Sequence, residues 1–135
     1  MKIKLIDFGY EKAPYRAHAN DAGADVHSTI DIVLAPGTTT RIPLGFGLEL
    51  PDGYMACIYP RSGLSCQGIV CELPPIDSGY RGEVHAIVSN ISNTHYSIEV
   101  GDRIGQLVVT PVIIAEFIDY DIKERGTGAF ASTGK

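Results

Sequence analysis

Residues 29–59, TIDIVLAPGTTTRIPLGFGLELPDGYMACIY, decide the fold class of this chain. β-branched and aromatic residues fill short runs here, and proline and glycine separate the runs at close intervals, as in Pro36-Gly37 and Pro51-Asp52-Gly53. Such breaks leave almost no room for an uninterrupted helix, whereas short strands joined by tight turns fit the spacing. We therefore expect strands at residues 29–34, 38–42, 47–50 and 54–59.

The same pattern continues to residue 114 and predicts an all-β fold. Further β-rich runs cover residues 84–90, 97–100 and 106–114. Short strands at regular spacing are typical of a sandwich or a barrel. The run 108–114 is largely apolar on both faces, which predicts burial on both sides, either in a thick core or against a neighbouring subunit.

Composition narrows the class of protein. A length of 135 residues and a hydrophobic fraction of 44% predict one soluble domain. The net charge of −5 argues against a nucleic-acid binder, because such proteins neutralise phosphates with surplus Lys and Arg. No segment resembles a signal peptide or reaches transmembrane length, so we expect a cytoplasmic protein that does not bind membranes.

The cysteines predict neither a disulfide framework nor a metal site. The chain has three of them, Cys57, Cys66 and Cys71, without regular spacing. The four histidines do not cluster with them in sequence, as structural zinc would require. We expect the cysteines to be small, partly buried apolar residues.

Residues 60–65, Pro-Arg-Ser-Gly-Leu-Ser, follow an apolar run and combine a guanidinium, a hydroxyl and a glycine. These are parts of a phosphate cradle, since Arg pairs with phosphate oxygens and Gly lets the backbone approach a ligand. The same letters also describe an ordinary turn.

Residues 76–84, Ile-Asp-Ser-Gly-Tyr-Arg-Gly-Glu-Val, predict a two-residue hairpin turn at Ser78-Gly79. Asp77 and Tyr80 would close this turn and point to the same face. The carboxylate would then accept a proton from water or bind a sugar hydroxyl, and the ring would pack against the sugar. The alternative is a structural Asp that caps the turn.

Two more segments contain charged groups at turns. Asp21 and Asp25 lie four residues apart among small residues, and residues 101–107 place Asp102, Arg103 and Gln106 at the start of a strand. Both segments suit a solvated surface loop. The acidic pair Asp21 and Asp25 would also suit Mg²⁺, which needs only one or two carboxylates when substrate phosphates supply the other ligands.

The tail from residue 125 is small and polar except for Phe130. Its composition is typical of a mobile terminus. It also contains Arg125, hydroxyls and amides flanked by glycine, which a flap closing over a triphosphate would need.

Together these five segments resemble the five motifs of the trimeric dUTP pyrophosphatase family, in the same order and over nearly the whole chain. The resemblance implies a β-barrel or jelly-roll-like domain over residues 1–124 and a flexible arm over residues 125–135. It also implies hydrolysis of dUTP to dUMP and pyrophosphate with Mg²⁺, at sites shared between the chains of a homotrimer.

The family's deoxyuridine site falls on residues 71–85. By resemblance, Asp77 activates the attacking water and binds the 3′-hydroxyl, and Tyr80 packs against deoxyribose and excludes a 2′-hydroxyl. The sequence departs from the family at residues 71–75, where many relatives carry an Asn and a Gly-rich approach. We therefore expect backbone groups around Ile76 to read uracil, with Pro75, Cys71 and His85 as its neighbours.

The family's phosphate contacts fall on two other segments. By resemblance, Arg61 and Ser62 contact phosphates while Gly63 lets the backbone approach. Gln106 is a polar ligand on the phosphate side, and Asp102 is expected to fix Arg61.

The metal and arm residues complete the set. By resemblance, Asp25 holds hydrated Mg²⁺ together with the substrate phosphates. Arg125, Ser132 and Thr133 grip the outer phosphates, and the ring of Phe130 covers uracil. Ala129 and Ala131 stand where the arm often has Gly, and should stiffen it slightly.

Two other functions remain open at this stage. A dCTP deaminase resembles this family in its phosphate loop, but it uses a catalytic Glu and lacks the Asp-x-x-Tyr turn. A nucleotide-sensing module without activity would need none of the catalytic groups that are present here.

Overall fold

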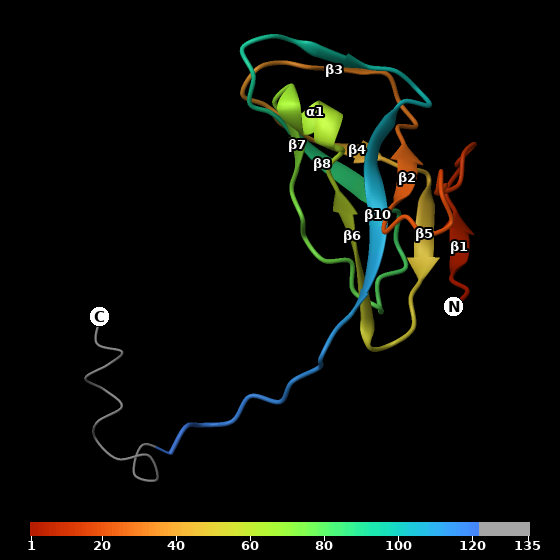
Figure 1. The fold of residues 1–135 in the computed structure, drawn as a ribbon, viewed down its shortest axis with the longest axis vertical. Coiled ribbons are helices and arrows are strands. Elements are labelled where there is room, and N and C mark those ends of the chain that lie inside the picture. The colour runs from red at the N-terminus through yellow and green to blue at the C-terminus, as the bar shows by residue number, and fades with distance from the viewer. Residues whose placement is uncertain (122–135) are drawn as a thin grey trace.

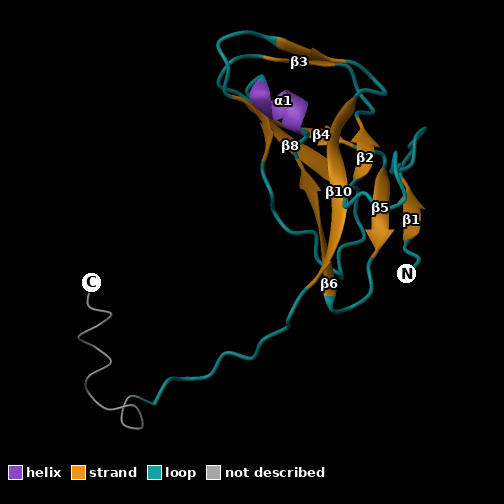
Figure 2. Ribbon diagram, viewed as in Figure 1, coloured by secondary structure: helices purple, strands orange, loops and turns teal. Residues whose placement is uncertain are grey.

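The longest element of the fold is strand β10 (Arg103–Pro111), and its two neighbours carry much of the candidate site. The computed structural model describes residues 1–121, and within them it contains ten strands and one helical turn (Figures 1 and 2). The other elements are β1 (Lys4–Asp7), β2 (Ala24–His27), β3 (Ile32–Leu34), β4 (Thr39–Pro43), β5 (Phe46–Glu49), β6 (Tyr54–Tyr59), α1 (Ser62–Cys66), β7 (Ile69–Cys71), β8 (His85–Asn90) and β9 (Tyr96–Ile98).

All the strand pairs are antiparallel and form small sheets. β10 lies between β2 and β6, and β8 lies between β4 and β7, while β1 pairs with β5 and β3 with β9. The two three-stranded sheets turn their apolar sides to one hydrophobic cluster, which includes Ile58 and Leu107 from one sheet and Ile42 and Val88 from the other. The expected all-β fold is thus confirmed.

Alternation along the strands explains which face is buried. In β8, Ala86 and Val88 are buried while His85 and Ile87 remain partly exposed. This period of two is what a strand with one side on the core requires. The outward side of β8 is therefore available to line a cavity.

The expected strands differ from the observed ones mainly at their ends. Residues 54–59 form β6 as expected, because Gly53 and Pro60 bound the run. The expected strand 29–34 shortens to Ile32–Leu34, since the backbone N–H of Thr29 bonds to Pro43 and that of Ile30 bonds to the Ser28 hydroxyl. β1, β2 and β7 were not expected.

The run 106–114 was predicted wrongly at both ends. β10 begins at Arg103 and ends at Pro111, after which residues 112–121 lead away from the body of the chain (Figure 1, blue). Ile113 is 93% exposed and Phe117 94% exposed. A thick core around this run is therefore excluded within the described chain, and the alternative of a neighbouring surface stays a prediction.

A short helix replaces the simple turn that residues 60–65 predicted. Helix α1 begins at Ser62 and buries Leu64, whose side chain belongs to the main core cluster. No helix within residues 1–121 is long and apolar enough to cross a membrane.

Candidate active site

One group of the predicted residues lies where β2, β10 and β6 meet. Asp25 on β2 is directly opposite Gln106 on β10, and Gln106 is opposite Tyr59 on β6. The Gln106 side chain donates a 3.1 Å hydrogen bond from Nε2 to the Pro60 carbonyl, at the entrance to α1. Three predicted segments that are distant in sequence thus meet at Gln106, two through strand pairing and the third through its side chain.

Gly23 makes room for this arrangement, although its role was not predicted. A Cβ atom at Gly23 would lie 2.2 Å from Oε1 of Gln106 and 2.8 Å from its Cβ. Any larger residue would therefore displace the glutamine. The sequence signal was a glycine beside Asp25, but its partner is more than 80 positions away.

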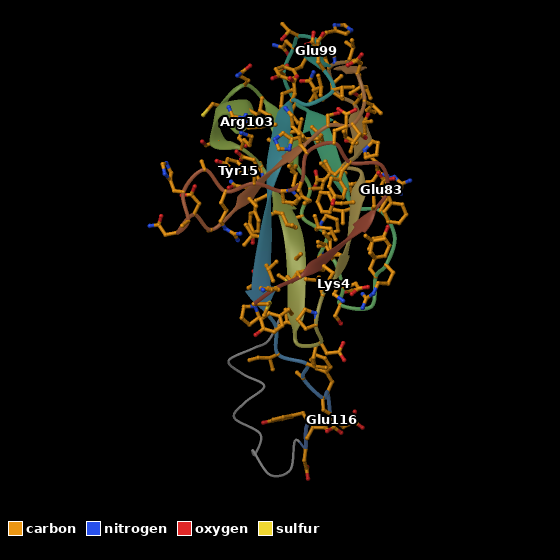
Figure 3. All side chains as sticks on the ribbon, turned by 90° about the vertical axis from the view of Figure 1, so that its right-hand side faces the viewer. Lys4, Tyr15, Glu83, Glu99, Arg103 and Glu116 are labelled. Atoms are coloured by element: carbon orange, nitrogen blue, oxygen red, sulfur yellow. The ribbon has the colours of Figure 1, made fainter. Side chains whose placement is uncertain are left out.

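One guanidinium group pairs with Asp25, and a second contacts the backbone of the first. Arg103 forms an ion pair with the carboxylate, with 3.6 Å between Nη1 and Oδ2, and Arg61 Nη1 donates a 3.4 Å hydrogen bond to the Arg103 carbonyl. Tyr15 pairs with Asp25 through the backbone on the side of β2 opposite to β10, the strand of Arg103, and both residues are labelled in Figure 3. Two guanidinium groups and one carboxylate thus lie close together here, and such groups can contact an anionic ligand.

Ser62 and Gly63 begin α1 next to Arg61 and are exposed. No atom lies within 4 Å of the position that a Cβ of Gly63 would occupy, so the space in front of this residue is open. The predicted phosphate-contacting residues Arg61, Ser62 and Gln106 are therefore brought to one side of the molecule.

Asp102 does not make the contact that was expected of it. Its Oδ2 accepts a 2.8 Å hydrogen bond from the Glu99 backbone N–H in the turn before β10. No ion pair joins Asp102 to Arg61 within residues 1–121. The expectation was wrong because a nearby backbone amide already holds this carboxylate, as is common for Asp in turns.

A second group of predicted residues lines a cavity of about 230 Å³. Five predicted residues contribute to its wall, namely Pro75, Ile76, Asp77, Tyr80 and His85. The remaining lining residues are Arg41, Ile58, Glu72, Pro74, Glu83, Val84 and Ile87. The cavity wall thus combines apolar residues with several polar or charged groups, the usual composition of a small-molecule site.

The turn at Ser78-Gly79 is present, but the hairpin is not. The Tyr80 N–H donates a 3.1 Å hydrogen bond to the Asp77 carbonyl, which closes the turn. The flanking residues do not pair with each other as strands, because Ile76 forms a bridge to Ala56 of β6 instead. Asp77 is exposed, and no hydrogen bond to its carboxylate is found within residues 1–121.

Tyr80 is held in place by contacts that the sequence did not reveal. Its hydroxyl donates a 2.7 Å hydrogen bond to the Glu83 carbonyl, and the Glu83 carboxylate accepts a 2.9 Å hydrogen bond from the Gly45 N–H. A Cβ at Gly82 would lie 2.5 Å from the Tyr80 hydroxyl oxygen. Gly82 and Glu83 are thus positioning residues for Tyr80, although the sequence pattern pointed only to Ile76, Asp77 and Tyr80 in this segment.

Both backbone groups of Ile76 already bond to β6, so its N–H cannot serve the expected reading of uracil by backbone groups around this residue. Its N–H donates to the Ala56 carbonyl at 2.7 Å, and its carbonyl accepts from the Ala56 N–H at 3.1 Å. Pro74 and Pro75 have no N–H to donate. This side of the cavity therefore has no free backbone donor from residue 74 to residue 76.

Cys71 does not line the cavity. Its side chain packs against the main core cluster, and Sγ lies 3.8 Å from the Ile104 carbonyl oxygen. Burial, together with the neighbouring charge of Glu72, raises the pKa of the Cys71 thiol to about 11. It is therefore a protonated, weakly reactive thiol, as the sequence predicted for a small apolar residue.

The two groups of residues do not meet in one chain. Asp25, Arg61, Ser62 and Gln106 are all absent from the cavity wall that Asp77 and Tyr80 share. β6 separates them, because Ile76 pairs along one of its edges while β10 pairs along the other. The predicted arm residues Arg125, Phe130, Ser132 and Thr133 lie outside the described residues.

Residues 1–121 contain no cluster of three or more His, Cys, Asp or Glu side chains suited to a metal. Asp25 provides one carboxylate on a rigid strand, with Arg103 beside one of its oxygens. A single carboxylate fits Mg²⁺ only in the mode where substrate phosphates and water complete the octahedron.

His27, on the same strand as Asp25, has a buried Nδ1 atom without a partner among the described residues. Its imidazole lies beside Lys12 and opposite Arg103 on β10. Burial, and then the charge of Lys12, lower the pKa of His27 below 6.5, and they outweigh the opposite effect of Asp25.

Comparison with known proteins places this arrangement in context. Residues 10–134 match the dUTPase family. The deoxyuridine 5′-triphosphate nucleotidohydrolase of Leifsonia xyli subsp. xyli is 41% identical over 131 residues, covering 92% of this chain and 86% of that protein. The enzyme of the same name from Clostridium tetani is 40% identical over 141 residues, covering 100% and 97%.

Solved structures agree with the sequence comparison. A variant of the dUTPase from phage phi11 of S. aureus, described for its structural Mg(II) ion, has a TM-score of 0.83 at 25% identity, covering 90% of this chain and 97% of that chain. A variant of the Staphylococcus bacteriophage 80alpha dUTPase with dUpNHpp has a TM-score of 0.83 at 26% identity, covering 89% and 96%.

Proposed function

Because the chain belongs to the dUTPase family of hydrolases, we propose that it hydrolyses dUTP to dUMP and pyrophosphate by attack of an Asp77-activated water on the α-phosphorus. The observation that carries this proposal is the exposed Asp77 carboxylate, which has no hydrogen-bond partner within residues 1–121 and shares a cavity with Tyr80. A carboxylate without a protein partner is free to orient water.

In the proposed reaction, Asp77 accepts a proton as the water oxygen bonds to the α-phosphorus. The bond from this phosphorus to the bridging oxygen breaks, and the electron pair leaves with pyrophosphate. Attack occurs in line with the leaving oxygen, so the position of the water matters as much as the basicity of the carboxylate.

Tyr80 sets the sugar preference in this proposal. The ring packs against deoxyribose. The hydrogen bond from its hydroxyl to the Glu83 carbonyl keeps the ring in one position. A 2′-hydroxyl would have to displace this ring. Deoxyribose is therefore preferred to ribose.

Charge neutralisation comes from the other group of residues. Arg61, Ser62 and Gly63 contact phosphates in front of α1, and Gln106 supports them from β10. Arg125, Ser132 and Thr133 add contacts to the outer phosphates, and Phe130 covers the base. Each cation offsets negative charge on the phosphate oxygens, which would otherwise repel the lone pair of the attacking water oxygen.

Mg²⁺ would be held through Asp25 and the substrate phosphates, and when bound it would supply further neutralisation of phosphate charge. The Arg103 guanidinium beside Asp25 keeps this carboxylate in place in the free protein. Because Asp25 is the one carboxylate at this position, Mg²⁺ would fit only if substrate phosphates and water supplied the other ligands.

The separation of the two groups supports the proposal of a homotrimer with shared sites. One chain's Asp77 cavity would face the Arg61 and Gln106 side of another, and residues 112–121 carry exposed apolar side chains that a neighbouring surface would bury. In the cell the enzyme would act in the cytoplasm, limit uracil incorporation into DNA and supply dUMP for dTMP synthesis.

The decisive experiment measures pyrophosphate release from dUTP, dCTP, dTTP and UTP with Mg²⁺. We expect turnover of dUTP and much weaker turnover of the others. Ammonia release from dCTP would indicate a deaminase instead. Absence of turnover on all four would overturn the proposed function.

A further inference from the structure

Backbone hydrogen bonds fix the turn that carries Asp77 at its two ends. Before the turn, Ile76 exchanges two hydrogen bonds with Ala56 of β6. After the turn, the Val84 N–H donates a 2.8 Å hydrogen bond to a carbonyl of β5. Residues 77–81 lie between these two anchors, so their position depends on contacts that they make themselves.

Within residues 1–121, one hydrogen bond joins the stretch 77–81 to a distant part of the chain. The Ser78 hydroxyl donates to Oδ1 of Asp52 over 3.0 Å. The other hydrogen bonds of this stretch come from Tyr80 and Arg81, and all of them end on carbonyl groups between residues 77 and 83. The bond to Asp52 is therefore what connects the middle of the turn to the rest of the fold.

Asp52 belongs to a rigid connection between β5 and β6. The ring of Pro51 restricts the backbone before it, and Gly53 after it has a φ of +86°, which other residues adopt only with strain. The Gly53 carbonyl accepts a 2.9 Å hydrogen bond from the Val112 N–H, at the point where the chain leaves β10 (Figure 1). The Asp52 carboxylate is thus a fixed point to which Ser78 is bound.

The position of the Asp77 carboxylate depends on the backbone of this turn, because no hydrogen bond to the carboxylate is found within residues 1–121. A misplacement of about 1 Å can lower the rate of a reaction by roughly 10²-fold. A hydrogen bond at the surface, by contrast, contributes little to global stability. The bond between Ser78 and Asp52 should therefore affect the rate of hydrolysis more than it affects folding.

We propose that Asp52 is a positioning residue for the reaction, which holds the turn through Ser78 so that the Asp77 carboxylate meets the attacking water. This inference rests on the proposed function, in which Asp77 is the base. Asp52 lies outside the cavity wall and outside the five segments that the sequence motifs identified. Its acceptor oxygen does the positioning, so an amide oxygen at the same place should serve as well.

The test measures kcat, KM and melting temperature for the full chain with dUTP and Mg²⁺. Asp52→Ala should lower kcat by about tenfold, less than a 1 Å misplacement can cost, because the two ends of the turn stay fixed. KM and melting temperature should change little, since Tyr80 keeps its bond to the Glu83 carbonyl. Asp52→Asn should recover most of the kcat that Asp52→Ala loses, because its amide oxygen still accepts from Ser78.

Further variants separate the hydrogen bond from changes of charge. Ser78→Ala removes the donor and should lower kcat to a similar extent. The double variant of Asp52→Ala and Ser78→Ala should lose no more than either single variant, because both changes remove the same bond. Glu49→Ala is the matched control. It removes an exposed carboxylate of β5 that has no hydrogen bond or ion pair within residues 1–121, and it should leave kcat unchanged.

The possible failures are distinguishable. A wild-type protein that releases no pyrophosphate from dUTP would overturn the proposed function itself. An active wild type with an equally active Asp52→Ala would overturn this inference alone. An equal loss in Asp52→Asn would assign the effect to charge, and losses that multiply in the double variant would show that Asp52 and Ser78 act separately. A large fall in the melting temperature of Asp52→Ala would make the bond structural, so each of these three results would also overturn the inference.

Discussion

The hydroxyl of Tyr80 lies 2.7 Å from the carbonyl oxygen of Glu83 and donates a hydrogen bond to it, directly above the glycine at position 82. A Cβ at Gly82 would lie 2.5 Å from this hydroxyl oxygen and 2.7 Å from the ring carbon that bears it. The backbone between Tyr80 and Glu83 thus sets the position of the ring, and no other residue type fits there without moving it.

Gly82→Ala should therefore lower the preference for dUTP over UTP more than it lowers stability. The added methyl pushes the Tyr80 ring from its position against deoxyribose, and so opens space for a 2′-hydroxyl. The measurement is the ratio of kcat/KM for the two substrates. Gly79→Ala is the matched control, because no atom lies within 4 Å of its Cβ position; an equal effect of both changes would contradict the argument.

Asp77→Asn should lower kcat by roughly 10²- to 10⁴-fold, the range expected for loss of a positioned base. The fold and dUMP binding should persist, since this carboxylate holds no other described residue. Turnover of dUTP, dUMP affinity and melting temperature together test this expectation. Asp7→Asn changes another exposed carboxylate, whose single hydrogen bond among residues 1–121 comes from the Gly9 N–H, and should not change turnover. Wild-type turnover in Asp77→Asn would exclude Asp77 as the base.

Shared sites predict that two inactive variants restore each other. Asp77→Asn and Arg61→Ala each disable a different side of the proposed site, so mixed trimers refolded together should contain some sites with both intact residues. Activity of the mixture, compared with each variant refolded alone, is the measurement, and light scattering gives the number of chains. A monomer with full activity would rule out shared sites.

A chain that ends at Glu124 lacks all the arm residues to which phosphate and uracil contacts were assigned. It should still fold and bind dUMP, because the core cluster lies within residues 26–107. It should lose most hydrolysis of dUTP, since Arg125 and the hydroxyls would meet only the outer phosphates. Phe130→Ala should show a milder loss. Unchanged turnover after truncation would show that residues 125–135 are not needed for hydrolysis of dUTP.

Stability should depend on pH through His27. Its pKa is lowered in the folded chain, so the unfolded chain binds more protons between this lowered value and 6.5. Stability therefore rises with pH through that window, and the contribution of neutral His27 is lost as pH falls through the folded pKa. Urea unfolding at pH 7.5 and pH 5 should show a smaller loss for His27→Gln than for wild type. An identical loss in both proteins would show that other groups dominate.

Local patterns in the sequence were enough to predict some elements and not others. The run at β6 was predicted to the residue because a glycine and a proline enclose it. β2 and β7 were missed because three or four residues carry little pattern of their own, and their pairing with β10 and β8 stabilises them. The Ser78-Gly79 turn was local and correct, but the partner of Ile76 is Ala56, 20 positions earlier.

The same division holds for the candidate site. The sequence motifs identified Asp77, Tyr80 and Gln106. In the fold, Asp77 and Tyr80 line one cavity and Gln106 bonds to Pro60, which supports the roles proposed for them. The motifs did not reveal Gly23 or Gly82. A Cβ at these positions would clash with Gln106 or Tyr80, and such contacts are known only from the three-dimensional structure. The sequence also misjudged Asp102 and the N–H of Ile76, because these groups already form hydrogen bonds within the fold.

The segment with Pro74 and Pro75 has a thermodynamic consequence for binding. Hydrogen bonds fix both of its ends, from the Glu72 N–H to Ile87 and from the Ile76 N–H to Ala56, and the two proline rings restrict the backbone between them. This wall of the cavity therefore has its final shape before any nucleotide arrives, and little conformational entropy remains to be lost there on binding. A base should enter a rigid slot at this wall, and the slow rearrangements that accompany the reaction should arise elsewhere in the protein.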